Sequence, residues 1–209
     1  MSHIPGAGTA LVIASGNAGK VREFTALLAD LPLLVRPQPP GLEVEETGRT
    51  FAENARLKAT AVAQATGCWA LADDSGLAVA ALGGAPGVRS ARYADSDAAR
   101  ITRLLAELAA AGAHDPQQRQ AAFVAALAVA DPSGRVQVEV EGRCEGVIAT
   151  VPRGTGGFGY DPVFVVPALG LSFAEIDKAT KARVGHRGQA FARLEPRLRQ
   201  LLEQRGGDL

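Results

Sequence analysis

The sequence Ala-Leu-Val-Ile-Ala-Ser-Gly-Asn-Ala-Gly-Lys, residues 10–20, indicates the class of the fold. Its first five residues are apolar, and a short apolar run of this kind predicts a buried strand. The triplet from Ser15 to Asn17 breaks that run, and residues 18–29 then repeat apolar side chains at helical spacing. A strand that leads directly into a helix favours an α/β fold.

Further strands and helices are expected along the rest of the chain. Short apolar or alternating runs predict strands at residues 33–35, 69–72, 123–129, 136–140 and 163–166, and helical spacing predicts helices at residues 50–66, 96–111 and 189–204. Thr50 and Glu53 match a capping box, and the turn at residues 131–134 is typical of a hairpin. Because strands and helices alternate early and a hairpin comes late, we expect a mixed central sheet flanked by helices.

The composition narrows the class of function. The 209 residues contain 22 Lys and Arg and 22 Asp and Glu, and a formal net charge of zero argues against a broad nucleic-acid-binding surface. No apolar run approaches the roughly 20 residues of a membrane helix, and the N-terminus lacks the pattern of a secretory signal. We therefore expect a cytoplasmic protein that binds neither nucleic acid nor a membrane. Residues 1–209 are expected to form one domain, with residues 1–9 as a flexible tail.

The cysteines suggest no metal or redox centre. Cys68 and Cys144 lie far apart in the sequence and match neither a zinc motif nor a redox motif. Both are therefore expected to be buried or half-buried free thiols.

The turn from Ser15 to Lys20 is the first candidate site. Backbone N–H groups at a helix N-terminus favour an anion, glycines allow a close approach, and Lys20 adds a positive charge. These features predict a phosphate site. The segment is not a Walker A motif, because this chain has Ala14 and Val21 where that motif needs Gly and Ser or Thr. The alternative is an ordinary helix start, with Asn17 as the N-cap and Lys20 in solvent.

Two acidic pairs are the next candidates. Glu45 and Glu46 lie in a turn, where such a pair usually faces solvent but can also bind a hard cation. Asp73 and Asp74 follow a predicted strand, and adjacent like charges there are costly unless a metal ion or a basic group neutralises them. In the alternative interpretation, one aspartate caps the next turn and the other faces water.

Two later segments complete the set of candidates. Residues 154–162 satisfy G-x-G-x-x-G, but the strand expected after them excludes a dinucleotide-binding turn. Phe158 in this segment suits stacking on a planar base, or else it is buried in a plain loop. Residues 177–188 are strongly basic for a neutral protein, which indicates either a local basic site or a solvated helix face. No Ser-His-Asp or Cys-His triad can be assembled, so the residues favour metal-assisted chemistry on a phosphorylated, planar substrate.

Five segments of the chain form a recognisable set. They are Ser-Gly-Asn-Ala-Gly-Lys-Val-Arg-Glu (15–23), Glu-Thr-Gly-Arg-Thr-Phe-Ala-Glu-Asn-Ala-Arg-Leu-Lys-Ala (46–59), Ala-Asp-Asp-Ser-Gly-Leu (72–77), Gly-Thr-Gly-Gly-Phe-Gly-Tyr-Asp-Pro (154–162) and His-Arg-Gly (186–188). In this order, over about residues 10 to 203, they resemble the Ham1/RdgB family of inosine/xanthosine triphosphate pyrophosphatases.

The resemblance implies an enzyme that hydrolyses the noncanonical purine nucleoside triphosphates ITP, dITP and XTP to the monophosphate and pyrophosphate. Such an enzyme removes these nucleotides from the nucleotide pool. The resemblance also implies Mg²⁺ as the cofactor and a homodimer. The implied fold is a single bilobal α/β domain, with an elongated mixed sheet flanked by helices and the nucleotide cleft between the two lobes.

The same resemblance implies roles for individual residues. Asp74 would be the general base and a metal ligand, and Glu46 would be the second metal ligand. The triphosphate would be held by Ser15, Gly16, Asn17, Ala18, Gly19 and Lys20, with Lys58 near the phosphates. Contacts with the rest of the nucleotide are implied for Ser75, Phe158, Gly159, Tyr160, Asp161, Lys181, His186 and Arg187. Gly185 departs from the family pattern, because many members have Ser there, and this affects the expected base contacts.

Two other functions are weighed against this one. A phosphatase would release the terminal phosphate instead of pyrophosphate, and a nucleotide-sensing module would bind its ligand without turnover. The presence of Asp73, Asp74 and Glu46 together argues against a sensing module.

Overall fold

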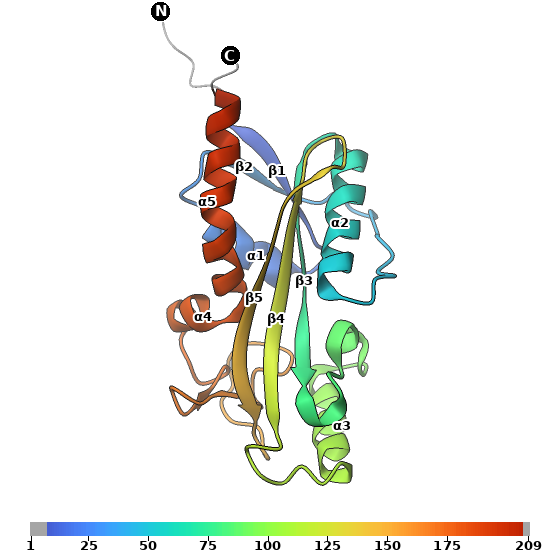
Figure 1. The fold of residues 1–209 in the computed structure, drawn as a ribbon, viewed down its shortest axis with the longest axis vertical. Helices are drawn as coiled ribbons and strands as arrows, with labels where there is room; N and C mark the ends of the chain where they lie inside the picture. The colour runs from blue at the N-terminus through green and yellow to red at the C-terminus, as the bar shows by residue number, and fades with distance from the viewer. Residues whose placement is uncertain (1–7, 207–209) are drawn as a thin grey trace, which may run out of the picture. The chain divides into compact units, whose positions relative to one another are not determined.

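The computed structural model describes residues 8–206, and its central feature is a mixed sheet of seven strands flanked by helices (Figure 1). The strands are β1 (Thr9–Ala14), β2 (Leu33–Pro37), β3 (Trp69–Val79), β4 (Gln120–Ala130), β5 (Val136–Ile148), β6 (Phe164–Val166) and β7 (Leu171–Ser172). The helices are α1 (Ala18–Leu27), α2 (Phe51–Thr66), α3 (Asp97–Ala110), α4 (Lys178–Val184) and α5 (His186–Gly206), with short 3-10 helices η1 (Ala80–Leu82) and η2 (Gly87–Arg92). The α/β class expected from the sequence is confirmed.

Parallel and antiparallel pairs occur at different ends of the sheet. The strand order is β2-β1-β3-β4-β5-β6-β7. Strand β1 pairs in parallel with β2 and β3, whereas β6 pairs antiparallel with β5 and β7. The predicted turn at residues 131–134 joins β4 to β5, and the Gly134 N–H closes it by donating to the Asp131 carbonyl at 2.8 Å.

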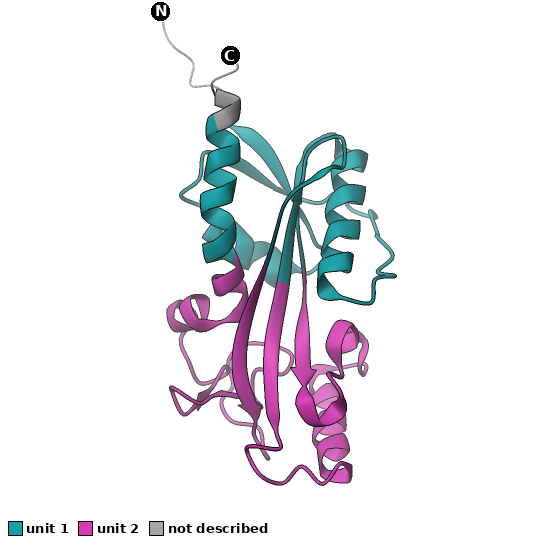
Figure 2. Ribbon diagram, in the orientation of Figure 1, with its two compact units in different colours: residues 1–73, 126–140, 191–209 teal, residues 74–125, 141–190 magenta. Residues whose placement is uncertain are grey.

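The chain divides into two compact units (Figure 2). Unit 1 contains residues 1–73, 126–140 and 191–209, and unit 2 contains residues 74–125 and 141–190. The division falls within β3, β4 and β5, so each of these strands contributes residues to both units. The single bilobal domain remains a prediction. Of the expected tail, Thr9 belongs to β1, and residues 1–7 lie outside the described residues.

In unit 1, small side chains cover the face of the sheet that packs against α2. This cluster contains Val12 and Ala14 of β1, Ala70 and Ala72 of β3, and Ala55, Ala59, Val62 and Ala63 of α2. The predicted capping box begins α2: the Thr50 hydroxyl accepts from the Glu53 N–H, and the Glu53 carboxylate accepts from the Thr50 N–H. The helix ends at Gly67, whose φ of 63° is readily available only to glycine.

The core of unit 2 contains a cluster of aromatic rings. The ring centroids of Phe123 and Phe164 are 4.7 Å apart, and Phe164 and Phe173 are separated by the same distance. Their tilted and edge-on packing is the favoured geometry for aromatic pairs. Helix α3 adds Ile101, Leu104 and Leu108 to the same cluster. This core supports the segments that carry the glycine-rich loop.

Several element boundaries differ from the prediction. Strand β3 does not end at Ala72 but continues through the two aspartates to Val79. The polar residues looked like the end of a strand because the sequence does not show which basic groups neutralise them. Strands β4 and β5 also extend beyond the predicted runs, and α5 begins at His186 instead of residue 189. Strand β7 has only two residues, too few for a recognisable pattern.

The cysteine prediction is confirmed for both residues. Cys68 is half-buried and Cys144 is buried, and both are free thiols. None of the helices within residues 8–206 combines the length and the apolar character that crossing a membrane requires.

Candidate functional site

The turn between β1 and α1 is fixed by its own side chains. Asn17 is the N-cap, and its side-chain oxygen accepts from the Gly19 N–H at 2.8 Å and the Lys20 N–H at 3.1 Å. The Ser15 hydroxyl accepts from the Asn17 N–H at 3.2 Å. The capped-helix interpretation is therefore correct for Asn17. It is wrong for Lys20, whose side chain is only 15% exposed and extends away from solvent.

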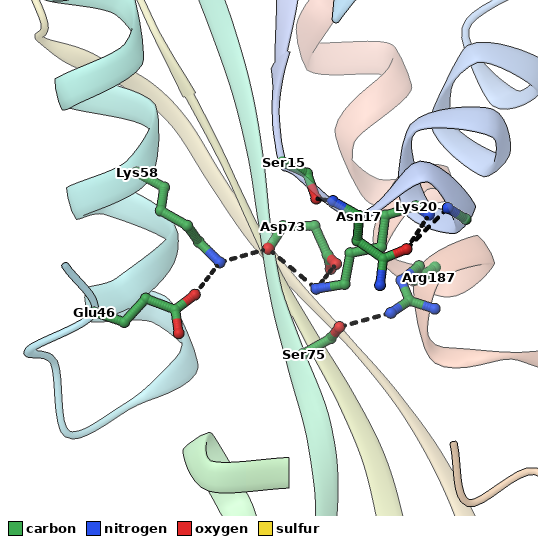
Figure 3. A network of polar contacts seen from close by, with 9 residues as sticks. Ser15, Asn17, Lys20, Glu46, Lys58, Asp73, Ser75 and Arg187 are labelled. Carbon is green, nitrogen blue, oxygen red and sulfur yellow. Dashed lines mark hydrogen bonds and ion pairs between the residues drawn. The ribbon is translucent and has the colours of Figure 1, made fainter. Parts of the chain in front are cut away.

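Lys20 and Lys58 both reach Asp73 of β3 (Figure 3). The Lys20 ammonium lies 2.8 Å from the Asp73 carboxylate, which is 1% exposed. The Lys58 ammonium, from α2, donates to the backbone carbonyl of Asp73 at 2.9 Å. Two positive charges from two helices thus meet at one strand position, and Lys20 neutralises a carboxylate that would otherwise be costly to bury.

The acidic turn before α2 is held close to the same lysine. Glu46 accepts from the Lys58 ammonium at 2.7 Å, and its side chain is 22% exposed, whereas Glu45 is exposed. The Gly48 N–H donates at 2.8 Å to the side-chain oxygen of Asn54, which is fully buried. A Cβ at Gly48 would lie 2.6 Å from that oxygen, so glycine is required there. The prediction that the acidic pair faces solvent is wrong for Glu46.

Asp73 and Asp74 are both buried, at 3% and 6% exposed, so the interpretation in which one of them faces water is wrong. Side chains alternate along a strand. Asp74 therefore shares a strand face with Ala72, which packs in the α2 cluster, and Asp73 lies on the opposite face. Ser75 shares the face of Asp73, and its hydroxyl accepts from the Arg187 guanidinium at 2.8 Å (Figure 3).

In unit 2, the glycine-rich loop presents an exposed aromatic ring. Phe158 is 44% exposed, so the interpretation in which it is buried is wrong. Two cations lie over the ring: the Lys181 ammonium is 5.2 Å and the Arg187 guanidinium carbon 5.6 Å from its centroid. Asp161 is buried, and its carboxylate accepts from the Phe158 N–H at 2.9 Å and pairs with Lys181. The exposed ring, the two cations and the buried carboxylate form one polar and aromatic cluster.

Two other predicted base contacts have side chains that are used within the core of unit 2. Tyr160 is buried, and its hydroxyl donates to the Ser90 carbonyl at 2.9 Å. Burial also raises the pKa of Tyr160 above its usual value. His186 is 4% exposed and stacks on Phe123, with ring centroids 4.8 Å apart and nearly parallel planes. Within the basic segment, Lys178 and Arg183 match the solvated-helix interpretation, whereas Lys181 and Arg187 do not.

Sequence reasoning missed two polar residues at these sites. Asn54 looked like an ordinary residue of a predicted helix, yet it holds the turn that carries Glu46. Asp97 looked like a first-turn helix residue, yet its carboxylate accepts from the Gly159 N–H at 2.7 Å. The only sequence signal for Asp97 was its place after the helix cap Ser96, and that position does not indicate a distant partner.

Comparison with known proteins identifies the family. The family model described as the Ham1 family matches residues 11–197. The chain belongs to the Ham1 family. The resemblance inferred from the five motifs is thereby confirmed.

Ham1-family relatives are similar over nearly their whole length. A protein of Parasynechococcus marenigrum named dITP/XTP pyrophosphatase is 62% identical over 192 residues, which cover 92% of this chain and 96% of that one. One of the same name from Synechococcus sp. is 63% identical over 197 residues, covering 94% and 93%. The solved structure of a HAM1 protein from Coxiella burnetii has a TM-score of 0.85 at 43% identity and covers 92% of this chain and 99% of that chain.

The carboxylates of this Ham1-family chain fit a magnesium ion in type. Within residues 8–206, no three or more His, Cys, Asp or Glu side chains form a group that could hold a metal by themselves. Mg²⁺, however, is commonly bound by one or two carboxylates together with substrate phosphates and water. The carboxylates of Glu46 and Asp74 are oxygen ligands of this kind. Asp74 lies on the face of β3 that also carries Ala72 of the α2 cluster.

Proposed function

We propose that this Ham1-family chain hydrolyses noncanonical purine nucleoside triphosphates, namely ITP, dITP and XTP, to the nucleoside monophosphate and pyrophosphate. The observation that carries the proposal is the set of contacts around Asp73, where Lys20 pairs with the buried carboxylate, Lys58 donates to the backbone carbonyl, and a second buried carboxylate, Asp74, follows. The similar proteins named dITP/XTP pyrophosphatase support the same substrate class.

Lys20 and Lys58 supply positive charge for the phosphates. A nucleoside triphosphate brings about four negative charges. Each of the two ammonium groups is already within 3 Å of a carboxylate oxygen, on Asp73 or Glu46. Phosphate oxygens form equally strong charge-assisted hydrogen bonds, so each lysine can exchange one anionic partner for another over a short distance. The N-terminus of α1, from Ser15 to Lys20, adds the favourable end of a helix dipole.

Glu46 and Asp74 are the residues that we propose to hold Mg²⁺, which when bound offsets phosphate charge and lowers the pKa of the attacking water. Asp74 would accept the proton of that water at a carboxylate oxygen. Asp73, whose carboxylate is paired with Lys20, would hold the lysine ammonium in position before the phosphates bind. This division of roles follows from the opposite strand faces on which the two aspartates lie.

The unit 2 residues supply the features that a purine base needs. The exposed ring of Phe158 offers a stacking surface. A deaminated purine carries a 6-keto acceptor, and the Arg187 guanidinium or a backbone N–H can donate to it. Adenine has an amino donor at that position, so two donors would face each other and neither would be satisfied. We propose that the units bind different parts of one nucleotide, in a single bilobal domain.

Three further parts of the proposal are Mg²⁺ as the physiological ion, a homodimer and a cytoplasmic location. The family resemblance supports the ion and the homodimer, whereas the cytoplasmic location is the expectation from the sequence alone. The two competing functions differ from this proposal in their products. A terminal phosphatase would release inorganic phosphate first, and a sensing module would release nothing.

The test is a product assay on the purified full chain. We expect ITP, dITP and XTP, incubated with Mg²⁺, to yield pyrophosphate and the monophosphate in equal amounts by phosphorus NMR. ATP and dATP serve as the control and should be hydrolysed far more slowly. Inorganic phosphate as the first product would select the phosphatase. Tight binding of dITP without hydrolysis would select the sensing module.

A further inference from the structure

The loop that carries Phe158 needs external support. Four of the six residues from Gly154 to Gly159 are glycine, and Gly157 and Gly159 have φ values of 73° and 61°. Glycine-rich segments lose the most conformational freedom when they are ordered. A ring at the tip of such a loop is therefore a poor stacking surface unless the protein holds its backbone.

Two carboxylates bind the two peptide groups that flank Phe158. The Phe158 N–H donates to Asp161 at 2.9 Å, and the next peptide N–H, that of Gly159, donates to Asp97 at 2.7 Å. Because these N–H groups belong to the peptide planes on either side of the Phe158 Cα, the two bonds together fix its φ and ψ. The Asp161 carboxylate holds only the first plane. In the second plane, the Phe158 carbonyl accepts from the Asp161 N–H at 3.2 Å, and Asp97 adds the bond to the N–H.

Each carboxylate is itself held by a cation. Asp161 is paired with Lys181 of α4. Asp97 accepts from the Arg100 guanidinium at 2.6 Å, and Arg100 also donates to the Ala94 carbonyl at 3.0 Å. Asp97 is the first residue of α3, directly after the N-cap Ser96, so its backbone is fixed by the helix. All of these groups belong to unit 2.

We infer that Asp97 is a positioning residue for base recognition: it holds the Gly159 peptide so that Phe158 is preorganised for stacking. This inference rests on the proposed function, because it concerns the same base-binding surface. Asp97 does not itself contact the substrate or the reacting atoms. Its loss should therefore weaken the binding of the base and leave the chemical step unchanged.

The experiment compares Asp97→Ala with Asp97→Asn, which keeps one side-chain oxygen able to accept from the Gly159 N–H. For dITP we expect Asp97→Ala to raise KM about tenfold with kcat within about twofold, and Asp97→Asn to recover most of the loss. The inhibition constant of inorganic tripolyphosphate, which has no base, should not change in either variant. Asp95→Ala, which removes a nearby exposed negative charge, is the matched control and should keep the wild-type KM.

Hydrogen exchange gives a readout that needs no activity. We expect the amides of residues 157–160 to exchange faster in Asp97→Ala than in the wild type, and Asp97→Asn to restore their protection. Unchanged exchange and an unchanged KM in Asp97→Ala would overturn the inference. An equal loss for dITP and tripolyphosphate would also overturn it, because the effect would then not concern the base. A wild-type chain without dITP hydrolysis would refute the proposed function separately, while the exchange experiment would still decide whether Asp97 holds the loop.

Discussion

The ammonium group of Lys58 lies 2.7 Å from the carboxylate of Glu46, on the turn that precedes its own helix. The same ammonium donates to the backbone of Asp73 in β3. One lysine thus connects the acidic turn, helix α2 and the strand that carries both aspartates. This contact places a predicted metal ligand beside a predicted phosphate ligand within unit 1.

Asp74→Asn should lower kcat for dITP by at least about a hundredfold, because the amide can neither accept the proton of water nor carry the charge that a metal ligand needs. The fold should be retained, since asparagine has nearly the same shape as aspartate. Steady-state kinetics and a thermal melt measure the two effects. Asp30→Asn, at an exposed position, is the control. Retained activity in Asp74→Asn together with lost activity in Asp73→Asn would exchange the roles of the two aspartates.

Lys20→Ala should raise KM for dITP by about tenfold and also lower Tm, because the Asp73 carboxylate, 1% exposed, loses its ammonium partner. Adding Asp73→Asn should restore part of the lost Tm, since no uncompensated charge then remains. Lys178→Ala, at an exposed position in α4, tests whether removing any lysine has the same effect. An unchanged KM in Lys20→Ala would argue against a phosphate site at the start of α1.

Gly48→Ala should displace the acidic turn, because its Cβ would lie 2.6 Å from the Asn54 oxygen and 2.7 Å from the Glu53 Cβ. We expect a loss of about 1–3 kcal/mol in the free energy of unfolding, as is typical of overpacking. The Mg²⁺ concentration for half-maximal activity should rise, because Glu46 moves with the turn. Thr47→Ala at the exposed neighbouring position is the control for both measurements. If Mg²⁺ dependence is unaffected despite a lower stability, Glu46 does not bind the ion.

Cys144 should resist thiol reagents in the folded protein. Burial raises the pKa of its thiol to about 11, so at pH 8 almost none of it is the reactive thiolate. We expect a chromogenic disulfide reagent to modify Cys68 first and Cys144 only after unfolding. The same shift predicts that Cys144 stabilises the fold below about pH 8.5, the pKa of an ordinary thiol. That contribution is lost as the pH rises toward 11, because the unfolded chain releases this proton first. Rapid modification of both thiols at pH 8 would contradict this prediction.

Local patterns in the sequence predicted those parts of the structure that depend on neighbouring residues. The capping box at Thr50 and Glu53 correctly located the start of α2, because a cap is formed by residues three positions apart. The end of β3 was predicted wrongly, because the charge of Asp73 is neutralised by Lys20, 53 residues away in the sequence, and no local pattern shows this partner. For Phe158, the sequence left open whether the ring is exposed for stacking or buried, again because the deciding contacts are distant in the sequence. Whether a ring in a glycine loop is buried depends on groups such as Lys181, which the sequence alone does not place.

The same distinction holds for the candidate sites. The motifs singled out Glu46, Asp74 and Lys20 because those residue types have obvious chemistry for phosphate and metal. They did not single out Asn54 or Asp97, which act on the backbone of other segments. The bond from Gly159 to Asp97 spans 62 residues, and no local pattern predicts such a contact.

The way the chain passes between its two units limits how the protein can be dissected. It crosses from one to the other within β3, β4 and β5 and near the start of α5. Unit 1 is built from three separate segments and unit 2 from two, so any continuous fragment that contains all of one unit also carries residues of the other. Truncation therefore cannot isolate a phosphate-binding half or a base-binding half, and changes to either must be made by substitutions in the intact chain.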